Sequence, residues 1–205
     1  MHSTHSLLCL GDSYTIGESV LPRENFPNQV IGMLRQSKYE FEDAEIIAKT
    51  GWTTDELQDA INVSQVKEAY DFVTLLIGVN NQYRGRSVEE YIPQFESLLK
   101  QAIYFANGNP DHVIVLSIPD WGITPFATSV PGTSRAQISS EIDSFNSANE
   151  RIAGSYKVNY IDITPSTREA FHDQSLLAPD GLHPSGKEYS IWAEKVYSIV
   201  KSRLN

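Results

Sequence analysis

Three residues near the two ends of the chain have the side-chain types needed for acyl transfer. Ser13 follows Gly11 and Asp12 close to the N-terminus, and Asp180 and His183 lie three residues apart near the C-terminus. A serine hydroxyl is a weak nucleophile until a base takes its proton, and histidine is suited to that exchange. A carboxylate on the other ring nitrogen fixes the tautomer and stabilises the imidazolium. These residue types predict a nucleophile with a base and an orienting acid.

Two further segments contain groups that could stabilise a negatively charged tetrahedral intermediate. Such an intermediate needs hydrogen-bond donors directed at its oxyanion. Gly51 permits close approach of the backbone, and the side chain of Asn80 carries an amide N–H. A serine that begins a helix is also backed by N–H groups without helical partners. The sequence therefore supplies both backbone and side-chain donors.

Five apolar segments predict the strands that must position these residues, and helical stretches separate them. Capping-box spacing marks several helix starts, as in Thr53 with Glu56 and Ser87 with Glu90. Strands that alternate with helices favour an α/β fold, in which a parallel sheet is covered on both faces. The predicted strands are Ser6–Leu10, Ala44–Ala48, Phe72–Ile77, His112–Ile118 and Val158–Ile161.

The composition of these strands predicts their order in the sheet. The first, third and fourth are nearly continuous apolar runs, which is typical of central strands. The second and fifth contain Glu45 and Asn159, which favours the two edges. We therefore expect a flavodoxin-like, three-layer α/β/α sandwich with a five-stranded parallel sheet of order 2-1-3-4-5. The active crevice of such a sheet lies outside the carboxyl ends of its strands.

Four short blocks occur in order along the chain. They are Gly11-Asp12-Ser13, Gly51, Gly78-Val79-Asn80-Asn81 and Asp180-Gly181-Leu182-His183. In these blocks the chain resembles the SGNH hydrolases, also called GDSL-type esterases and lipases. The blocks run from residue 11 to residue 184, and the resemblance implies that residues 1–205 form one hydrolase domain.

The resemblance implies a role for each block residue. Ser13 would attack the acyl carbon, His183 would act first as general base and then as general acid, and Asp180 would orient His183. The backbone N–H groups of Ser13 and Gly51 and the side-chain amide of Asn80 would form the oxyanion hole. An acyl-enzyme would form and water would release the acid, without a metal or an organic cofactor.

Two positions depart from the family pattern. The third block often reads Gly-x-Asn-Asp, whereas Asn81 replaces the acid in this chain. This replacement puts the local hydrogen bonding in question, although the key amide of Asn80 is retained. The first block continues with Tyr14 in place of leucine, at a position that is not expected to take part in the chemistry.

Side chains beside the blocks could contact a small acylated substrate. The segment 119–132 follows the fourth predicted strand, and its aromatic residues could form a wall of the acyl or alcohol pocket. Tyr83 lies beside the third block and could contribute. Ordinary packing against the sheet edge is the alternative for each of these rings. The expected substrate-binding residues are Asp12, Tyr14, Trp52, Asn81, Trp121 and Phe126.

Several functions remain open at this point. An acylesterase, a lysophospholipase, a thioesterase and a carbohydrate deacetylase all fit the same residues, because the fold does not choose among them. A non-catalytic flavodoxin-like domain that binds FMN or a phosphate is a different alternative. Asp12 argues against it, since an acid in the first loop repels phosphate. A degenerate hydrolase that binds acylated ligands without turnover is a further alternative, which Asn81 suggests.

Composition narrows the range of partners. The 205 residues carry a net charge of −10 without a Lys/Arg cluster, which disfavours nucleic acid. No stretch is long enough to span a bilayer, so stable membrane insertion is not expected. The N-terminal apolar run is too short for a signal peptide, which predicts a cytoplasmic protein, or a secreted one if a signal was removed. Cys9, the only cysteine, is expected to be buried and inert, and the oligomeric state stays open.

Overall fold

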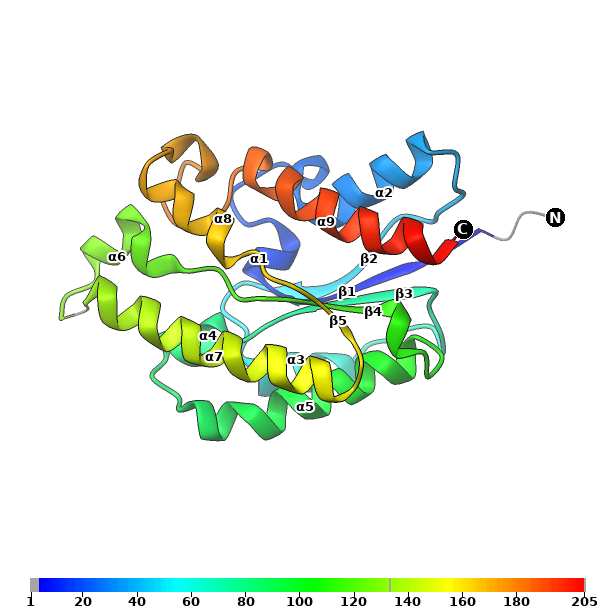
Figure 1. Ribbon diagram of the computed structural model, residues 1–205, viewed down its shortest axis with the longest axis horizontal. Helices are drawn as coiled ribbons and strands as arrows, with labels where there is room; N and C mark the ends of the chain where they lie inside the picture. The colour runs from blue at the N-terminus through cyan, green and yellow to red at the C-terminus, as the bar shows by residue number, and fades with distance from the viewer. Residues whose placement is uncertain (1–3, 133, 205) are drawn as a thin grey trace.

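A five-stranded sheet separates two layers of helices in the computed structural model, which describes residues 4–132 and 134–204 (Figure 1). The layers confirm the predicted α/β/α sandwich. On one face lie the long helices α2 (Phe26–Gln36) and α9 (Gly186–Leu204). The opposite face is covered by α3 (Thr54–Val63), α5 (Val88–Phe105) and α7 (Arg135–Ser155).

All neighbouring strands in the sheet are parallel, and their order is β2-β1-β3-β4-β5, as the sequence predicts. The residues of the three inner strands are all buried, whereas both edge strands include half-buried positions. Inner strands lie under helices on both sides, which explains their continuous apolar runs. The strands are β1 (Leu7–Asp12), β2 (Glu45–Lys49), β3 (Phe72–Leu76), β4 (Val113–Leu116) and β5 (Asn159–Ile161).

The strand boundaries differ from the predicted ones by one or two residues. β1 continues to Asp12, because its pairing with β2 extends to the pair of Asp12 and Lys49. The fourth strand was expected to include His112, but Pro110–His112 forms a 3-10 turn and β4 begins after it. Proline fixes its own φ and lacks an N–H, so this segment favours a turn over a paired strand.

Short helices connect the carboxyl ends of the strands to the rest of the chain. The side chain of Ser87 accepts a hydrogen bond from a backbone N–H in the first turn of α5, as its spacing predicts, and that of Ser134 does the same in α7. The short α-helices are α1 (Ser13–Ile16), α4 (Val79–Tyr83), α6 (Pro125–Ser129) and α8 (Thr164–Arg168). The 3-10 turns are η1 (Pro22–Glu24), η2 (Pro110–His112), η3 (Trp121–Ile123), η4 (Glu169–Phe171) and η5 (Gln174–Leu176).

Gly11 allows α1 to start directly at the end of β1. A Cβ atom at this position would lie 2.4 Å from the carbonyl oxygen of Leu76 and 2.1 Å from Oγ1 of Thr15. Both distances are too short for non-bonded atoms, so any side chain would force β1 away from β3 or displace α1. The glycine that precedes Asp12 and Ser13 therefore has a packing requirement of its own.

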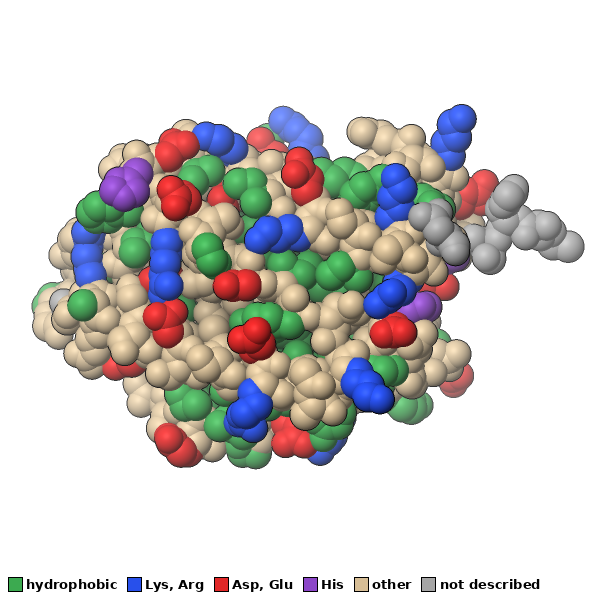
Figure 2. Space-filling model, in the orientation of Figure 1, with side chains coloured by type: hydrophobic (Ala, Val, Ile, Leu, Met, Phe, Trp, Pro, Cys, Tyr) green, Lys and Arg blue, Asp and Glu red, His purple; other side chains and the backbone are tan. Residues whose placement is uncertain are grey.

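Cys9 lies in β1 and is fully buried, as expected. Burial raises the pKa of its thiol to about 12, so the reactive thiolate is not populated near neutral pH. Figure 2 shows one face of the molecule, on which Lys and Arg side chains are interspersed with Asp and Glu. Among residues 4–132 and 134–204, no helix has the length and apolar character needed to cross a membrane.

Candidate active site

The turn between β1 and α1 places Ser13 at the carboxyl edge of the sheet. The carboxylate of Asp12 caps α1 by accepting a hydrogen bond of 3.0 Å from the backbone N–H of Tyr14. Gly17 closes the helix in the left-handed region at φ 79°, a conformation that glycine adopts without strain. Its N–H and that of Glu18 both donate to the carbonyl oxygen of Ser13. The backbone on both sides of Ser13 is thus held by local bonds.

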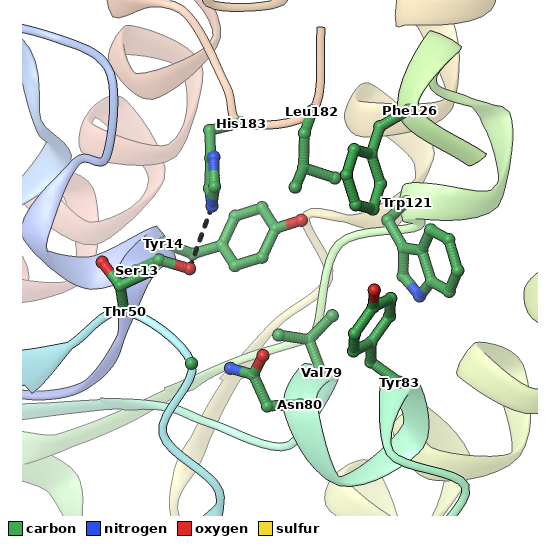
Figure 3. A pocket seen from close by; sticks show the side chains of 11 residues that line it. Ser13, Tyr14, Thr50, Val79, Asn80, Tyr83, Trp121, Phe126, Leu182 and His183 are labelled. Carbon is green, nitrogen blue, oxygen red and sulfur yellow. Dashed lines mark hydrogen bonds between the residues drawn. The ribbon is translucent and has the colours of Figure 1, made fainter. Parts of the chain in front are cut away.

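Ser13 and His183 meet at this edge although they are 170 positions apart. His183 Nε2 lies 3.0 Å from Ser13 Oγ (Figure 3). His183 Nδ1 lies 2.7 Å from Asp180 Oδ2. If Nδ1 carries the ring proton and donates a hydrogen bond to Asp180, Nε2 presents its lone pair to the serine hydroxyl. The structure therefore brings the three predicted residues into one hydrogen-bonded chain.

Asp180 is held in place by its own segment. Its Oδ1 atom accepts hydrogen bonds from the backbone N–H groups of Leu182, at 2.9 Å, and His183, at 3.0 Å. Partial burial acts to raise the pKa of Asp180, but hydrogen bonds from His183, Ser19 and these N–H groups outweigh it and lower the pKa to about 2. The carboxylate is thus ionised at neutral pH and available to stabilise an imidazolium.

Ser19 is a contact of the acid that the sequence did not predict. Its hydroxyl donates a hydrogen bond of 2.7 Å to Asp180 Oδ2, the oxygen that also faces the histidine. Ser19 has φ 64°, in the left-handed region that non-glycine residues rarely adopt. No spacing rule indicates this contact, because the two residues are 161 positions apart.

Asn80 lies across the cavity from His183 (Figure 3), and Gly51 also lines the cavity. The Asn80 amide donates to the backbone carbonyl oxygen of Trp52 at 3.0 Å and to Asp12 Oδ2 at 3.4 Å. Gly51 has φ 85°, and its carbonyl oxygen accepts a 2.6 Å hydrogen bond from Arg84. Arg84 also pairs with Glu56, so the peptide at Gly51 is fixed from α3 and α4.

Asn81 resolves the departure from the family pattern. It is fully buried, and its Oδ1 atom accepts a 3.1 Å hydrogen bond from the backbone N–H of Thr54. Its Nδ2 atom donates to the hydroxyl of Thr54 at 2.7 Å, and that hydroxyl donates in turn to Gln94. An amide supplies the donor and the acceptor that this position uses. Asn81 therefore joins the start of α3 to α4.

Asp12 is also buried, directly behind the site. Its side chain is fully inaccessible, and burial raises its pKa to about 7 despite the opposing hydrogen bond from the Tyr14 N–H. Because the carboxyl also contacts the Asn80 amide, it couples the turn at Ser13 to α4. The side chain of Asp12 supports this framework and does not face the cavity.

A cavity of about 160 Å³ opens beside Ser13 and His183. Of the six residues expected to bind substrate, Tyr14, Trp121 and Phe126 line it, whereas Asp12, Trp52 and Asn81 do not. The polar members of the second group face inward to complete hydrogen bonds of the framework. The remaining lining residues are Ser13, Thr50, Gly51, Val79, Asn80, Tyr83, Leu182 and His183.

Val79 and Leu182 were not predicted as lining residues. Each occupies the variable position of a block, between Gly78 and Asn80 and between Gly181 and His183. A residue flanked by two positions of the site is carried to the same surface, so this adjacency was the available signal. Tyr14 also contacts the base, because its ring lies 5.0 Å from the imidazole of His183, centroid to centroid.

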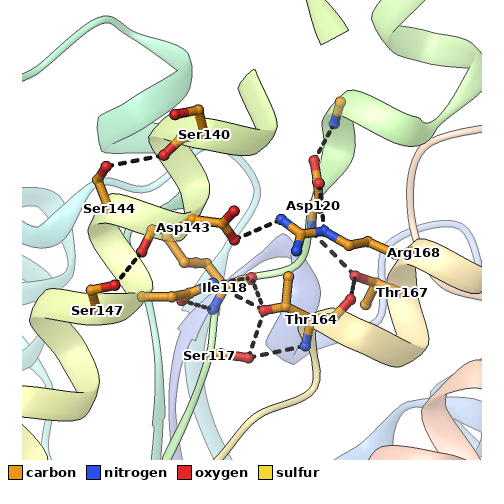
Figure 4. A network of polar contacts seen from close by, with 12 residues as sticks. Ser117, Ile118, Asp120, Ser140, Asp143, Ser144, Ser147, Thr164, Thr167 and Arg168 are labelled. Carbon is orange, nitrogen blue, oxygen red and sulfur yellow. Dashed lines mark hydrogen bonds and ion pairs between the residues drawn. The ribbon is translucent and has the colours of Figure 1, made fainter. Parts of the chain in front are cut away.

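The position of Trp121 depends on a polar network behind β4 (Figure 4). Asp120 is 1% exposed, and its carboxylate pairs with Arg168 at 2.9 Å and accepts from the backbone N–H of Gly122 at 2.9 Å. Arg168 also pairs with Asp143 on α7 at 2.6 Å. A buried carboxylate needs such partners, and here they fix the turn that carries Trp121.

Two further bonds complete the cavity wall. The indole Nε1 of Trp121 donates to Gln82 Oε1 at 2.7 Å, and Gln82 in turn donates to Glu141 at 2.7 Å. The backbone N–H of Phe126 donates to the carbonyl oxygen of Gly181 at 3.2 Å, which ties α6 to the loop that carries the base.

Solved structures similar to this chain share its fold. The lipase/acylhydrolase from Enterococcus faecalis aligns with a TM-score of 0.75 at 18% identity, over 98% of this chain and 97% of that one. The acetylxylan esterase Axe2 from Geobacillus stearothermophilus aligns with a TM-score of 0.74 at 19% identity, over 98% of this chain and 96% of that one. TesA aligns with a TM-score of 0.70 at 17% identity, over 96% of this chain and 98% of that one. A search of curated protein sequences returned no match.

A family model provides the sequence-level evidence. The model of the GDSL-like lipase/acylhydrolase family matches residues 9–191, a segment that contains all four blocks. Esterases are also among the solved structures with this fold. The match spans far more than half of the chain, which therefore belongs to the GDSL-like lipase/acylhydrolase family and is a carboxylic ester hydrolase.

Proposed function

We propose that the protein hydrolyses esters of small carboxylic acids through an acyl-enzyme intermediate on Ser13. The observation that carries this proposal is the hydrogen-bonded chain from Ser13 through His183 to Asp180, at the edge of a cavity that also contains Asn80. A nucleophile, a base, an orienting acid and a donor for the oxyanion are the components of serine-based acyl transfer.

In the first half-reaction, Ser13 Oγ attacks the acyl carbon and its proton passes to His183 Nε2. Asp180 accepts a hydrogen bond from His183 Nδ1–H throughout and stabilises the imidazolium. The carbonyl oxygen becomes an oxyanion, which the N–H groups of Ser13 and Gly51 and the amide of Asn80 stabilise. When the intermediate collapses, the imidazolium gives its proton to the departing alcohol.

In the second half-reaction, water replaces the alcohol. His183 Nε2 takes a proton from the water, whose oxygen attacks the acyl carbon on Ser13. Collapse of the second intermediate returns the proton to Ser13 Oγ and releases the carboxylic acid. The same groups therefore serve both halves of the reaction.

The contacts of Asn80 suit a donor that changes partner during the reaction. Its 3.0 Å bond to the Trp52 carbonyl keeps the amide in place. Its contact of 3.4 Å with Asp12 is long for a hydrogen bond. Exchanging this weak contact for an oxyanion costs little, so the second N–H can serve the intermediate.

The size of the cavity favours small acyl groups. Its volume of about 160 Å³ is close to that of an engineered protein cavity of roughly 150 Å³ that binds benzene. Tyr14, Val79 and Leu182 give it apolar walls suited to a hydrocarbon. An acetyl or butyryl group fits within this volume, and the alcohol would extend toward solvent.

Hydrolysis of p-nitrophenyl butyrate by the wild type and by Ser13→Ala tests the proposal. We expect turnover by the wild type and a loss of roughly a thousandfold or more in Ser13→Ala. We also expect a butyryl adduct in the intact-mass spectrum of the wild type that is missing in Ser13→Ala. Equal rates in the two proteins would reject the serine mechanism. Binding of acylated ligands without turnover would instead identify a degenerate hydrolase.

Matched substrates separate the remaining ester classes. Acetyl-coenzyme A and an acetylated xylose offer the nucleophile the same acyl group in a thioester and in a sugar ester, respectively. Among the structures with this fold, Axe2 is an acetylxylan esterase, so the sugar ester is the direct comparison. The kcat/KM values on these compounds rank the leaving groups.

A further inference from the structure

Two cavities lie on either side of the same pair of aromatic side chains. The first, of about 160 Å³, contains Ser13, and the second, of about 380 Å³, lies beyond it. Tyr83 and Trp121 line both of them. The second cavity is lined in addition by Gln82, Gly85, Val130, Ile138 and Glu141, among others. The two rings therefore separate the reactive cavity from a larger space.

The two rings are held with unequal strength. Trp121 is 3% exposed and its indole N–H is bonded to Gln82 at 2.7 Å. Tyr83 is 48% exposed and contacts its neighbours through its ring, 5.2 Å from Trp121 and 6.4 Å from Phe126, centroid to centroid. Removing the side chain of Tyr83 thus disturbs fewer buried contacts than removing Trp121.

The direction of the cavity places Tyr83 at its far end. Figure 3 shows Ser13 and Thr50 at one side, and Tyr83 beside Trp121 at the other. Val79 and Leu182 lie between these ends, from α4 and from the loop before α9. A hydrocarbon chain that starts at Ser13 and follows these apolar side chains meets the Tyr83 ring.

We propose that the ring of Tyr83 limits the length of the acyl chain to about six carbons, on the scale of a cavity that holds one benzene molecule. This proposal rests on the esterase function proposed above and names the residue that sets its substrate range. Longer chains do not fit in front of the ring. Without the ring, they continue along Val130 and Ile138 into the second cavity.

The test compares kcat/KM for the p-nitrophenyl esters of acetate, butyrate, hexanoate, octanoate and decanoate. We expect the wild type to prefer butyrate or hexanoate and to lose efficiency beyond that length. In Tyr83→Ala, the ratio of decanoate to butyrate efficiency should rise about tenfold or more. Each methylene that becomes buried raises kcat/KM by up to about fourfold, so several methylenes account for this increase.

Three variants control for other causes. Tyr83→Phe keeps the ring without the hydroxyl and should retain the wild-type length profile. Tyr83→Trp adds volume and should shift the preference toward acetate. Tyr104→Ala removes a tyrosine that is 68% exposed on α5 and lines neither cavity, so its profile should match the wild type.

The outcomes distinguish the two proposals. If wild type and Ser13→Ala show the same background rate on every ester, the esterase function fails. If the wild type turns over but Tyr83→Ala and Tyr83→Trp both keep its length profile, the proposed role of Tyr83 is wrong. A wild type that already prefers decanoate over butyrate would overturn it as well. Thermal melting of each variant shows that the folded protein is being compared.

Discussion

The segment that carries the base and the wall that closes the cavity are held by contacts of very different range along the chain. Asp180 reaches its histidine over three positions and bonds to backbone groups of the same segment. Trp121 is held by a hydrogen bond to Gln82, which is 39 positions away. The turn before it is held by the pair of Asp120 and Arg168, which are 48 positions apart. The base is positioned mainly by bonds within its own segment, to which Ser19 adds one distant contact, and the wall is positioned by the tertiary structure.

This difference separates two kinds of information in the sequence. Short blocks describe the chemical groups, and the first and last blocks also build their own turns through bonds from Asp12 and Asp180 to nearby N–H groups. The wall at Trp121 is described by no block, since bonds from α4, α7 and α8 hold this residue and the turn before it. We therefore expect changes in the blocks to act mainly on kcat and changes behind the wall to act mainly on KM.

Replacing Asn80 by alanine should produce the largest of these effects short of removing the nucleophile. One oxyanion donor contributes about a hundred- to a thousandfold in kcat, so Asn80→Ala should lower kcat by this factor with a small change in KM. Steady-state kinetics on p-nitrophenyl butyrate measure both. Asn62→Ala, at an exposed position of α3, is the control. A near-normal kcat would remove Asn80 from the oxyanion hole.

Gln82→Leu should disturb the wall without touching the reacting atoms. It leaves the buried indole N–H of Trp121 without its partner, and an unpaired buried donor is costly. We expect KM for butyrate to rise by about tenfold, with kcat nearly unchanged. Gln137→Leu is the matched control, because it removes a bond to the same Glu141 without changing the bond to Trp121. If kcat of Gln82→Leu fell by about as large a factor as KM rose, the expected division between effects on kcat and effects on KM would be contradicted.

Ser19→Ala should have a smaller effect on kcat, because the other bonds to Asp180 remain. One neutral donor to a carboxylate contributes on the order of 1.5 kcal/mol, so a fall of about tenfold in kcat is the upper expectation. Ser19→Gly distinguishes the effect of losing the hydroxyl from the effect of backbone strain, since glycine adopts the positive φ of this position without strain. If Ser19→Ala loses activity and Ser19→Gly does not, backbone strain and not the hydroxyl is responsible.

Asp12 should make the folding stability depend on pH. Its pKa is raised to about 7 by burial, whereas an unfolded chain would release the proton near 3.8. Between these values the folded state binds more protons, so its stability is fully present below the unfolded pKa and falls as pH rises. The side chain in Asp12→Asn cannot ionise. The fall in Tm from about pH 5 to about pH 8 should therefore be several degrees smaller in this variant than in the wild type.

Differential scanning calorimetry of the wild type and Asp12→Asn at both pH values measures this change. Asp59→Asn, at an exposed position, is the control. Parallel loss of Tm in wild type and Asp12→Asn would mean that this carboxyl ionises in the folded protein as readily as in the unfolded chain.

The sheet was predictable because its inner strands are nearly continuous apolar runs and its edge strands are not. The exact ends were not, since the length of β1 depends on its partner and not on its own residues. The proximity of Ser13, His183 and Asp180 could be predicted from their types and spacing. Ser19 and Arg84 could not, because they reach Asp180 and Gly51 across 161 and 33 positions.

The expected substrate contacts illustrate the same limit. Adjacency to a block correctly places Tyr14 at the cavity, but it does not reveal which neighbours turn inward. Asp12 and Asn81 are polar and next to block positions, yet both complete bonds inside the framework. Only the orientation of each side chain in the folded chain separates these cases.

The inaccessible thiol of Cys9 has a practical consequence for labelling. Cysteine is the usual competitor of an activated serine for electrophilic reagents, and here the single one is enclosed in β1. A maleimide applied to the folded wild type should therefore leave its mass unchanged. A cysteine introduced at the mouth of the cavity would then be the sole accessible thiol, so one fluorophore or spin label could report on ligand entry without mutating the native residue.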